Sequence, residues 1–185
     1  AASGLDGDPV AKAYQALRGL HDVLPDEVAR WHFLEHTARA VFGRYGFREI
    51  RTPLLEATEL FARSVGQASD IVRKEMYTLE RGGESMSLRP ENTASVVRAF
   101  VEHALYRNVA AGYPERLYYV GPMFRYERPQ KGRMRQFSQI GAEAIGSDHP
   151  AVDAEVLEML ARFLGQVGIR SPACLNGIVG HKPTY

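Results

Sequence analysis

Five cationic side chains lie close together in the stretch FRYERPQKGRMRQFSQ, residues 124–139, where only Glu127 opposes them. Arginine presents a planar fork of donors that suits phosphate or carboxylate groups. Because the whole chain carries a formal net charge of only +1, this positive charge is a local feature. It predicts a site for a polyanion and not a generally basic surface. The cationic residues are Arg125, Arg128, Lys131, Arg133 and Arg135.

Two strands joined by a polar loop would position these side chains. Side chains alternate between the two faces of a strand, so Arg125 and Glu127 share one face. Such a face fits a nucleoside triphosphate beside a small amine, because an aromatic ring can stack and a carboxylate can bind an ammonium group. A glycine in the row is expected to leave a gap for a ligand. The plain alternative is a solvated charged face. The returning strand would add Arg135, Phe137, Gln139, Gly141 and Glu143.

The rest of the chain predicts an α+β domain. Hydrophobic spacing indicates helices from Pro25 to about residue 45 and over 58–65, 91–106 and 150–166. Strands are expected over 47–56, broken near Pro53, and in antiparallel hairpins over 75–90 and 116–146. Antiparallel hairpins surrounded by helices are typical of the α+β class. Residues 14–169 would form this domain, with a flexible leader at 1–13 and an irregular tail at 170–185.

Composition narrows the function classes. The chain has 185 residues, of which 45% are hydrophobic and 24% charged, a normal globular balance. Its single cysteine excludes an internal disulfide, so a reducing, cytoplasmic compartment is expected. No apolar run approaches the ~18 residues of a membrane span. The six histidines lack metal-ligand spacing, so no protein-bound metal is expected.

The stretch FRYERPQKGRMRQFSQIGAE resembles motif 2 of the class II aminoacyl-tRNA synthetases, and in detail that of the histidine–tRNA ligase family. RGLHDVLP and GFREIRTPLLE are similar to that family's opening segment and motif 1. DIVRKEMYTLE and SLRPENTASVVRAF are similar to its substrate-side hairpin and following helix. The resemblance covers roughly Tyr14 to Ile169 and implies part of a class II catalytic core.

The resemblance implies a role for individual residues on the nucleotide side. Arg125 matches the arginine that contacts the ATP α-phosphate and would act in catalysis. Glu127 matches a carboxylate near the adenine end, and Arg133 a residue that reaches the terminal phosphates. ATP would bind as a substrate together with Mg²⁺, which phosphates and few carboxylates would hold.

On the amino acid side, Gln139 and Glu143 match positions that read bound histidine. Glu91 and Thr93 match residues that hold its amino group. Each has a plainer interpretation as well. A glutamate near a helix start is favoured by the helix dipole, and Thr93 could be an ordinary exposed helix residue.

The family resemblance also implies partners: ATP, histidine and tRNA(His), with no membrane. Pro53 lies in the segment that forms the dimer interface of class II enzymes, so a homodimer is expected. A motif 3 arginine and an RGLDYY-type segment do not occur in this sequence. Histidyl-adenylate formation and transfer by this chain are therefore expected to be weak or incomplete. The alternatives are a non-catalytic relative such as the regulatory subunit of ATP phosphoribosyltransferase, or a dimerising remnant.

Overall fold

The computed structural model describes residues 14–65, 75–109, 113–127 and 133–169, so the expected leader and tail lie outside the described residues. Helices surround two three-stranded sheets, with strand orders β1-β5-β6 and β2-β4-β3. This is the α+β class that the sequence predicts. The elements are α1 (Pro25–Arg44), β1 (Arg48–Glu49), β2 (Leu55–Ala57), α2 (Thr58–Val65), β3 (Thr78–Arg81), β4 (Glu84–Leu88), α3 (Thr93–Glu102), the 3-10 helix η2 (Leu105–Asn108), β5 (Glu115–Phe124), β6 (Gln136–Ile145) and α4 (Pro150–Gln166).

The long hairpin β5–β6 is the centre of the molecule. Its two strands pair antiparallel over their whole length, from Glu115 opposite Ile145 to Phe124 opposite Gln136. β1 lies on the other side of β5 and runs parallel to it. The sequence had predicted no pairing partner for this strand. A strand of two residues offers no alternation from which the direction of its partner could be read.

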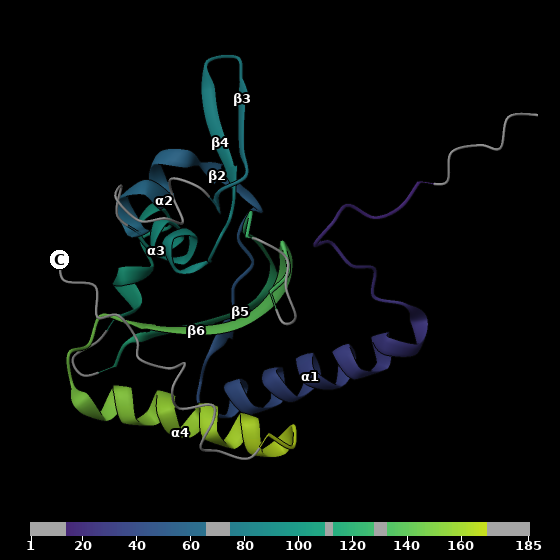
Figure 1. Ribbon diagram of the computed structural model, residues 1–185. Helices are drawn as coiled ribbons and strands as arrows, with labels where there is room; N and C mark the ends of the chain where they lie inside the picture. The colour runs from purple at the N-terminus through teal and green to yellow at the C-terminus, as the bar shows by residue number, and fades with distance from the viewer. Residues whose placement is uncertain (1–13, 66–74, 110–112, 128–132, 170–185) are drawn as a thin grey trace, which may run out of the picture.

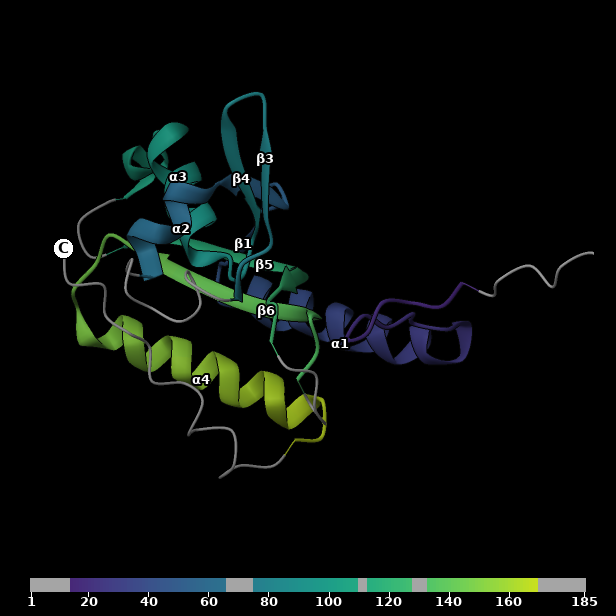
Figure 2. The same cartoon turned by 45° about the horizontal axis from the view of Figure 1, so that its top comes forward.

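The two long helices α1 and α4 lie across one face of the β5–β6 hairpin (Figures 1 and 2). Phe42 of α1 is at the centre of this layer. Its ring meets Tyr118 of β5 edge-on at 5.4 Å and Phe163 of α4 at 5.8 Å between ring centroids. Such edge-to-face pairs add to the stabilisation from buried apolar area. The packing of α1 and α4 therefore stabilises the hairpin on this face.

The opposite face of the hairpin packs against α3 and the polar site. Leu117, Tyr119 and Met123 of β5 are buried there against Val96 of α3. Tyr118 and Tyr119, which are consecutive, thus enter different cores. The alternation predicted for this hairpin is confirmed, and it separates a structural face from a face that is available for function.

The second sheet stands beside α2 and α3 and carries the projecting hairpin β3–β4 (Figure 1). Its turn is made by Gly82 and Gly83, both with positive φ (62° and 83°), as predicted for a two-glycine turn. The break near Pro53 is also confirmed, because β1 and β2 on either side of it belong to different sheets. The segment around Pro53 therefore links the two sheets.

Helix α3 is shorter than predicted, running from Thr93 to Glu102 and not from residue 91 to 106. Ala104 adopts a left-handed conformation (φ 51°), and the chain continues as η2. Leu105 packs against the core from this 3-10 turn. Its place in the sequence therefore fits the spacing of a hydrophobic helix face, although α3 has already ended. Among the described residues, no helix combines the length and the hydrophobicity needed to cross a membrane.

Candidate functional site

The loop between β4 and α3 places Glu91 at the start of the helix. Its Oε2 accepts a hydrogen bond from the backbone N–H of Thr93 at 2.7 Å, and its Oε1 accepts one from Ala94 at 3.1 Å. These bonds satisfy two of the free N–H groups of the first helical turn. Capping alone therefore explains a glutamate at this position, and its predicted contact with a ligand stays a prediction.

Thr93 and Glu143 meet across the gap between α3 and β6. The Thr93 hydroxyl donates to Glu143 Oε1 at 2.7 Å. Burial raises the pKa of the Glu143 carboxyl, and the negative charge of Glu91 raises this pKa further, whereas the hydroxyls of Thr93 and Tyr119 lower it. A carboxylate that is removed from water and has an acidic neighbour is costly to ionise. Such a group is suited to a cationic ligand, which would remove that cost.

Gly141 does not leave the open gap that the sequence predicts. A Cβ at this position would come within 2.3 Å of the hydroxyl oxygen of Tyr119, so the phenol already lies over the glycine backbone. The two residues are direct partners in the β5–β6 register. Tyr119 is buried, with 5% of its surface exposed. Burial raises the pKa of Tyr119, and the negative charges of Glu143 and Glu91 raise it further.

Arg125 follows β5 on the same face of the hairpin as Phe137. The centre of its guanidinium lies 5.2 Å from the Phe137 ring centroid, a cation–π arrangement. Its Nε donates to the carbonyl oxygen of Pro90 at 2.8 Å. The ring and the carbonyl orient the guanidinium while its two terminal nitrogens have no hydrogen-bond partner among the described residues. They are suited to bind an anion such as a phosphate.

Two buried side-chain acceptors of the hairpin have no hydrogen-bond donor among the described residues. Within the described part of the chain, neither Gln139 Oε1 nor Glu127 Oε2 has a hydrogen-bond partner. Arg133 Nη1 lies 3.5 Å from Glu127 Oε2, an ion pair beyond good hydrogen-bonding geometry, and its side chain is 64% exposed. Buried polar atoms are nearly always paired in native proteins. Gln139 Oε1, which has no hydrogen-bond partner among the described residues, therefore indicates a place where a ligand could supply a donor.

The other cations of the opening stretch divide into two groups. Arg135 is not directed at the cluster: its guanidinium lies 4.0 Å from the Tyr126 ring centroid and donates to the carbonyl oxygens of Glu127 and Arg18. Its expected place on the ligand face was wrong, because these contacts hold the N-terminal segment against the hairpin. Arg128 and Lys131 lie outside the described residues.

Sequence reasoning missed Arg89, which is only 5% exposed. Its Nε donates to Pro122 O at 3.0 Å, and its Nη1 donates to Thr52 O at 3.1 Å and to Asn92 Oδ1 at 3.2 Å. Burial lowers the pKa of Arg89. Gly121 makes room for it, since a Cβ there would lie 2.6 Å from Nη2. The position of Arg89 in the LRPENT segment was the signal in the sequence that could have identified it. Its hydrogen-bond acceptors, however, are spread over the chain.

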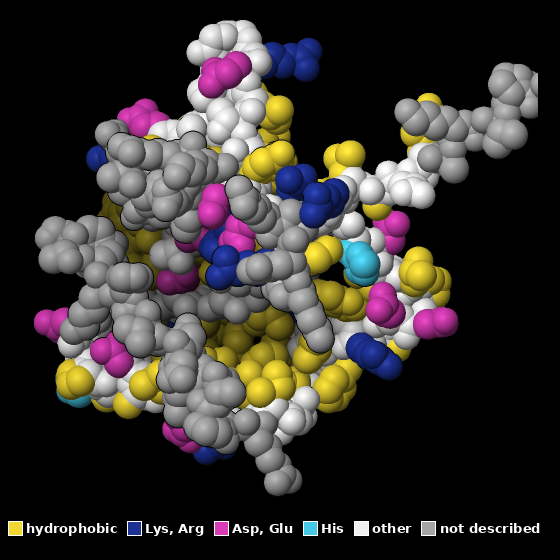
Figure 3. All heavy atoms as spheres, viewed as in Figure 1, with side chains coloured by type: hydrophobic (Ala, Val, Ile, Leu, Met, Phe, Trp, Pro, Cys, Tyr) yellow, Lys and Arg dark blue, Asp and Glu magenta, His cyan; other side chains and the backbone are white. Residues whose placement is uncertain are grey.

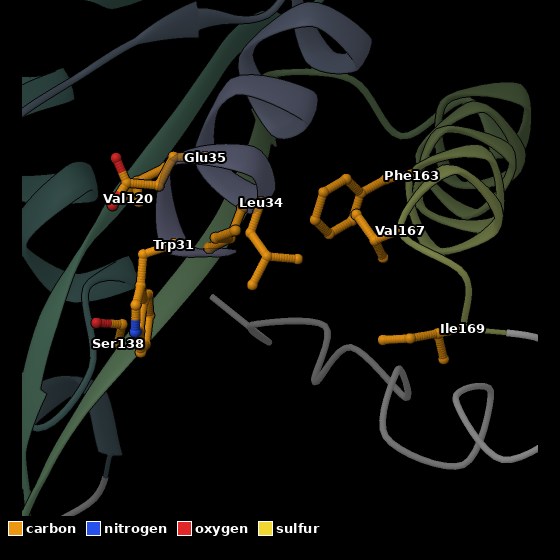
Figure 4. Close-up of a pocket in the computed structure, with 9 residues that line it drawn as sticks. Trp31, Leu34, Glu35, Val120, Ser138, Phe163, Val167 and Ile169 are labelled. Carbon is orange, nitrogen blue, oxygen red and sulfur yellow. The ribbon is translucent and has the colours of Figure 1, made fainter. Parts of the chain in front are cut away.

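An apolar pocket of about 320 Å³ lies away from these polar groups. It is formed between α1, α4 and the other face of the hairpin, where Leu34 and Phe163 point toward each other (Figure 4). We place the candidate site at the polar cluster and not here, because the pocket offers few polar groups to orient a ligand. The space-filling view shows acidic and basic side chains gathered below the β3–β4 hairpin, above a hollow lined with hydrophobic side chains (Figure 3). Within the described ranges, no three His, Cys, Asp or Glu residues could hold a metal ion together.

Pro53 lies in an exposed apolar run. Leu54 and Leu55, which follow it, are 43% and 41% exposed. The run is joined to the site through Arg89, whose guanidinium bonds Thr52 and whose backbone N–H donates to Leu54 O at 2.9 Å. Pro53 is thus accessible to a partner subunit, as a role in a dimer interface requires.

Comparison with known proteins gives a consistent result. Residues 19–180 match the family model described as histidyl-tRNA synthetase. The histidine–tRNA ligase of Geobacter metallireducens is 56% identical over 173 residues, which are 91% of this chain and 41% of that relative. The chain therefore spans about two fifths of the curated relatives it matches.

Solved structures agree with the family match. The apo histidyl-tRNA synthetase of S. aureus is 40% identical, with a TM-score of 0.71 over 85% of this chain and 36% of that one. A Bacillus halodurans structure, titled as an ATP phosphoribosyltransferase regulatory subunit/histidyl-tRNA synthetase, is 25% identical. Its TM-score is also 0.71, over 89% of this chain and 40% of that one.

Proposed function

This chain belongs to the histidyl-tRNA synthetase family, and from that premise we propose that its polar cluster binds ATP and histidine for histidyl-adenylate formation. The observation that carries the proposal is the arrangement of opposite charges on one face of the β5–β6 hairpin. The Arg125 guanidinium over Phe137 lies on the same face of the hairpin as the half-buried Glu143 carboxylate. An anionic nucleotide and a cationic amino acid would each find a complementary group there.

The nucleotide half of the proposal assigns ATP, as its Mg²⁺ complex, to Arg125, Glu127 and Arg133. In adenylation the histidine carboxylate attacks the α-phosphorus, a new P–O bond forms, and pyrophosphate leaves. Negative charge builds on the α-phosphate oxygens during this step, so a preoriented guanidinium stabilises the transition state more than the ground state. The bond from Arg125 Nε to Pro90 O and the Phe137 ring support that role, because they hold the guanidinium in place before the substrate arrives.

The histidine half assigns the amino acid to Glu91, Thr93, Gln139 and Glu143. The α-ammonium and the imidazole N–H of histidine are donors. Gln139 Oε1, which is unpaired among the described residues, and the Glu143 carboxylate are acceptors. Burial keeps the pKa of Glu143 raised, and a bound cation would offset the cost of ionising it. Both effects favour a ligand with positive charge over a neutral one.

The test is calorimetric titration of the chain with MgATP and with histidine, followed by histidine-dependent ATP–pyrophosphate exchange. We expect both ligands to bind and Glu143→Gln to weaken histidine without changing MgATP binding. We expect exchange to be slow in the isolated chain, because it contains no motif 3 arginine. Absence of histidine binding at millimolar concentration would contradict the proposal. Exchange at the rate of a full-length relative would contradict the role given to the absent arginine.

A non-catalytic relative is the second candidate, suggested by the likeness to the Bacillus halodurans structure. Such a protein would bind histidine and not ATP, so the same titrations decide between the two. The orientation of Arg125 favours the nucleotide-binding alternative, since a protein without ATP has no use for it. Failure to bind either ligand would leave a dimerising remnant as the better description.

Full-length activity would include transfer of histidine to tRNA(His), and we propose that this chain contributes the adenylation face to it. We also propose a homodimer that forms through the Pro53 segment. Supporting this, the apolar run after Pro53 is exposed and is connected by Arg89 to the loop that holds Glu91 and Thr93. An exposed apolar run next to a functional site is typical of an interaction surface.

A further inference from the structure

The opening segment, RGLHDVLP at residues 18–25, lies against the open end of the β5–β6 hairpin. The carbonyl oxygen of Gly19 accepts hydrogen bonds from the backbone N–H groups of Arg135 at 2.7 Å and of Gln136 at 3.3 Å. Gly19 has a positive φ of 86°, which glycine adopts more readily than any residue with a side chain. One carbonyl in a conformation that favours glycine therefore holds the start of β6.

The open end of the hairpin extends beyond both hydrophobic cores. On the face that packs against α1 and α4, the core residues nearest the open end are Val120 and Ile140. On the other face they are Met123 and Phe137. Arg125 follows all the core residues of β5 along the chain. Its backbone therefore depends on hydrogen bonds for its position.

Arg135 joins the opening segment to two residues of the nucleotide half of the site. Its carbonyl oxygen accepts a hydrogen bond from the backbone N–H of Arg125 at 2.9 Å. Its Nε donates to the carbonyl oxygen of Glu127 at 3.4 Å, and its Nη1 donates to that of Arg18 at 3.3 Å. The guanidinium also lies 4.0 Å from the centroid of the Tyr126 ring. Arg135 thus links the opening segment to the backbone on both sides of Tyr126.

The segment before β3 holds Tyr126 as well. The backbone N–H of Tyr126 donates to the carbonyl oxygen of Glu75 at 2.7 Å, and its ring meets the Tyr77 ring edge-on at 5.5 Å between centroids. Because the Tyr126 ring is 51% exposed, these contacts and not burial define its place. The guanidinium of Arg135 therefore lies over a ring that is itself held in position.

We propose that the opening segment is a positioning element of the nucleotide half of the site: Gly19 and Arg135 hold the backbone of Arg125 and Glu127, so that the Arg125 guanidinium is in place before MgATP binds. The inference rests on the proposed function for its ligand. Gly19 and Arg135 need not touch the nucleotide themselves. Their effect is transmitted through the backbone of the residues that bind it.

Gly168 provides a matched control for Gly19. It follows α4 with a φ of 82°, and no atom of the described residues lies within 4 Å of the position that a Cβ would take there. Gly19→Ala and Gly168→Ala each force a side chain into a positive-φ position. A general effect of backbone strain would appear in both variants, whereas a shift of the carbonyl that holds β6 is expected only in Gly19→Ala.

The first experiment measures amide hydrogen exchange by NMR in the ligand-free chain. We expect the amides of Arg125 and Arg135 to exchange at least about fivefold faster in Gly19→Ala and at an unchanged rate in Gly168→Ala. The amide of Ile50, which donates to Tyr118 O at 2.8 Å elsewhere in the same sheet, should be unaffected in both variants. Unchanged exchange at Arg125 and Arg135 in Gly19→Ala would overturn the proposal.

The second experiment measures the affinities for MgATP and for histidine by calorimetry. Strain at one positive-φ position predicts roughly three- to tenfold weaker MgATP binding in Gly19→Ala and no change in Gly168→Ala. Arg135→Gln, which removes the guanidinium, should weaken MgATP binding as well, whereas Arg162→Gln on the exposed face of α4 should not. Histidine affinity should be the same in all four variants.

The outcomes separate the positioning role from the proposed function. If the unaltered chain binds MgATP and Gly19→Ala binds it equally well, the positioning role is wrong while the proposed function stands. An equal loss of MgATP and histidine affinity in Gly19→Ala would show a general structural effect and would also overturn the positioning role. If the unaltered chain binds no MgATP, the proposed function fails, and the positioning role fails with it.

Discussion

The guanidinium of Arg125 lies 5.2 Å from the centroid of the Phe137 ring, on the face of the hairpin that also carries Gln139 and Glu143. This contact joins the end of β5 to the start of β6, and the same guanidinium donates to the carbonyl oxygen of Pro90, the residue before Glu91. Neither residue is held by helix α1 or α4, which cover the other face. The face of the hairpin that packs against α1 and α4 thus stabilises the fold, and the opposite face carries the candidate binding residues.

Gly141 is expected to be intolerant of any side chain. Gly141→Ala would place a methyl group 2.3 Å from the Tyr119 hydroxyl oxygen, so the ring must move. We predict a loss of about 1–3 kcal/mol in the free energy of unfolding, measured by urea denaturation.

Gly165 provides the control for this substitution. It lies within α4, and no atom lies within 4 Å of the position that a Cβ would take there. Gly165→Ala should therefore stabilise the chain by roughly 0.5–1 kcal/mol. Equal effects of the two substitutions would contradict the close approach of Tyr119 to Gly141.

Glu143 should make the chain less stable as pH rises. Its pKa is raised by burial in the folded state, so above about pH 4.3 the unfolded chain releases this proton first and unfolding is favoured. The loss in the free energy of unfolding grows until the pH exceeds the pKa of Glu143 in the folded state, and it is constant at higher pH.

Glu143→Gln removes this ionisation, and its amide oxygen can still accept from Thr93. We predict that its melting temperature matches that of the unaltered chain at about pH 3.5 and exceeds it at about pH 7.5. Thermal melts of both proteins across this range provide the test. A difference in melting temperature that does not vary with pH would show that Glu143 is not the titrating group.

Much of the fold could be predicted because the spacing of hydrophobic side chains along the sequence indicates helices and strands directly. The alternation along the returning strand placed Phe137 on the face opposite to that of its even-numbered neighbours, and in the structure Phe137 and Ile140 pack against different cores. The β3–β4 turn could be predicted from its pair of glycines in the same way, since positive φ favours glycine.

The contacts that complete the site could not be predicted in the same way. The position of Tyr119 over Gly141 depends on the register between two strands, and a shift of one residue would remove it. The capping of α3 by Glu91 and the shortening of that helix depend on local geometry that spacing does not encode. The partners of Arg89 are Thr52, Asn92 and Pro122, and no local pattern relates them.

Arg89 is expected to be essential for the assembly of the site. Arg89→Lys keeps the charge but cannot reach the acceptors on Thr52, Asn92 and Pro122 together. Leaving buried acceptors unsatisfied should cost about 2–4 kcal/mol in the free energy of unfolding, measured by urea denaturation.

Arg162 is the control, because it is exposed on α4, where it forms an ion pair with Glu158 one turn away. Arg162→Lys should change the free energy of unfolding by less than about 0.5 kcal/mol. If Arg89→Lys behaved like Arg162→Lys, the buried hydrogen-bond network of Arg89 would contribute little.

The exposed run after Pro53 should control association. We expect the chain to sediment as a dimer and Leu54→Glu, which adds a charge to a side chain that is 43% exposed, to shift it to the monomer. Leu79→Glu is the control, since Leu79 is 52% exposed on the projecting hairpin. Sedimentation velocity at several concentrations distinguishes these outcomes, and a monomer at all concentrations would contradict the proposed dimer.

The most direct test of the central claim is the affinity of the chain for MgATP in Arg125→Ala, measured by calorimetry against Arg162→Ala. Both variants lose one arginine, but only the first changes the guanidinium that lies over Phe137. We predict at least about tenfold weaker binding in Arg125→Ala and unchanged binding in Arg162→Ala. Equal affinity of Arg125→Ala and the unaltered chain would show that the phosphates of ATP bind elsewhere.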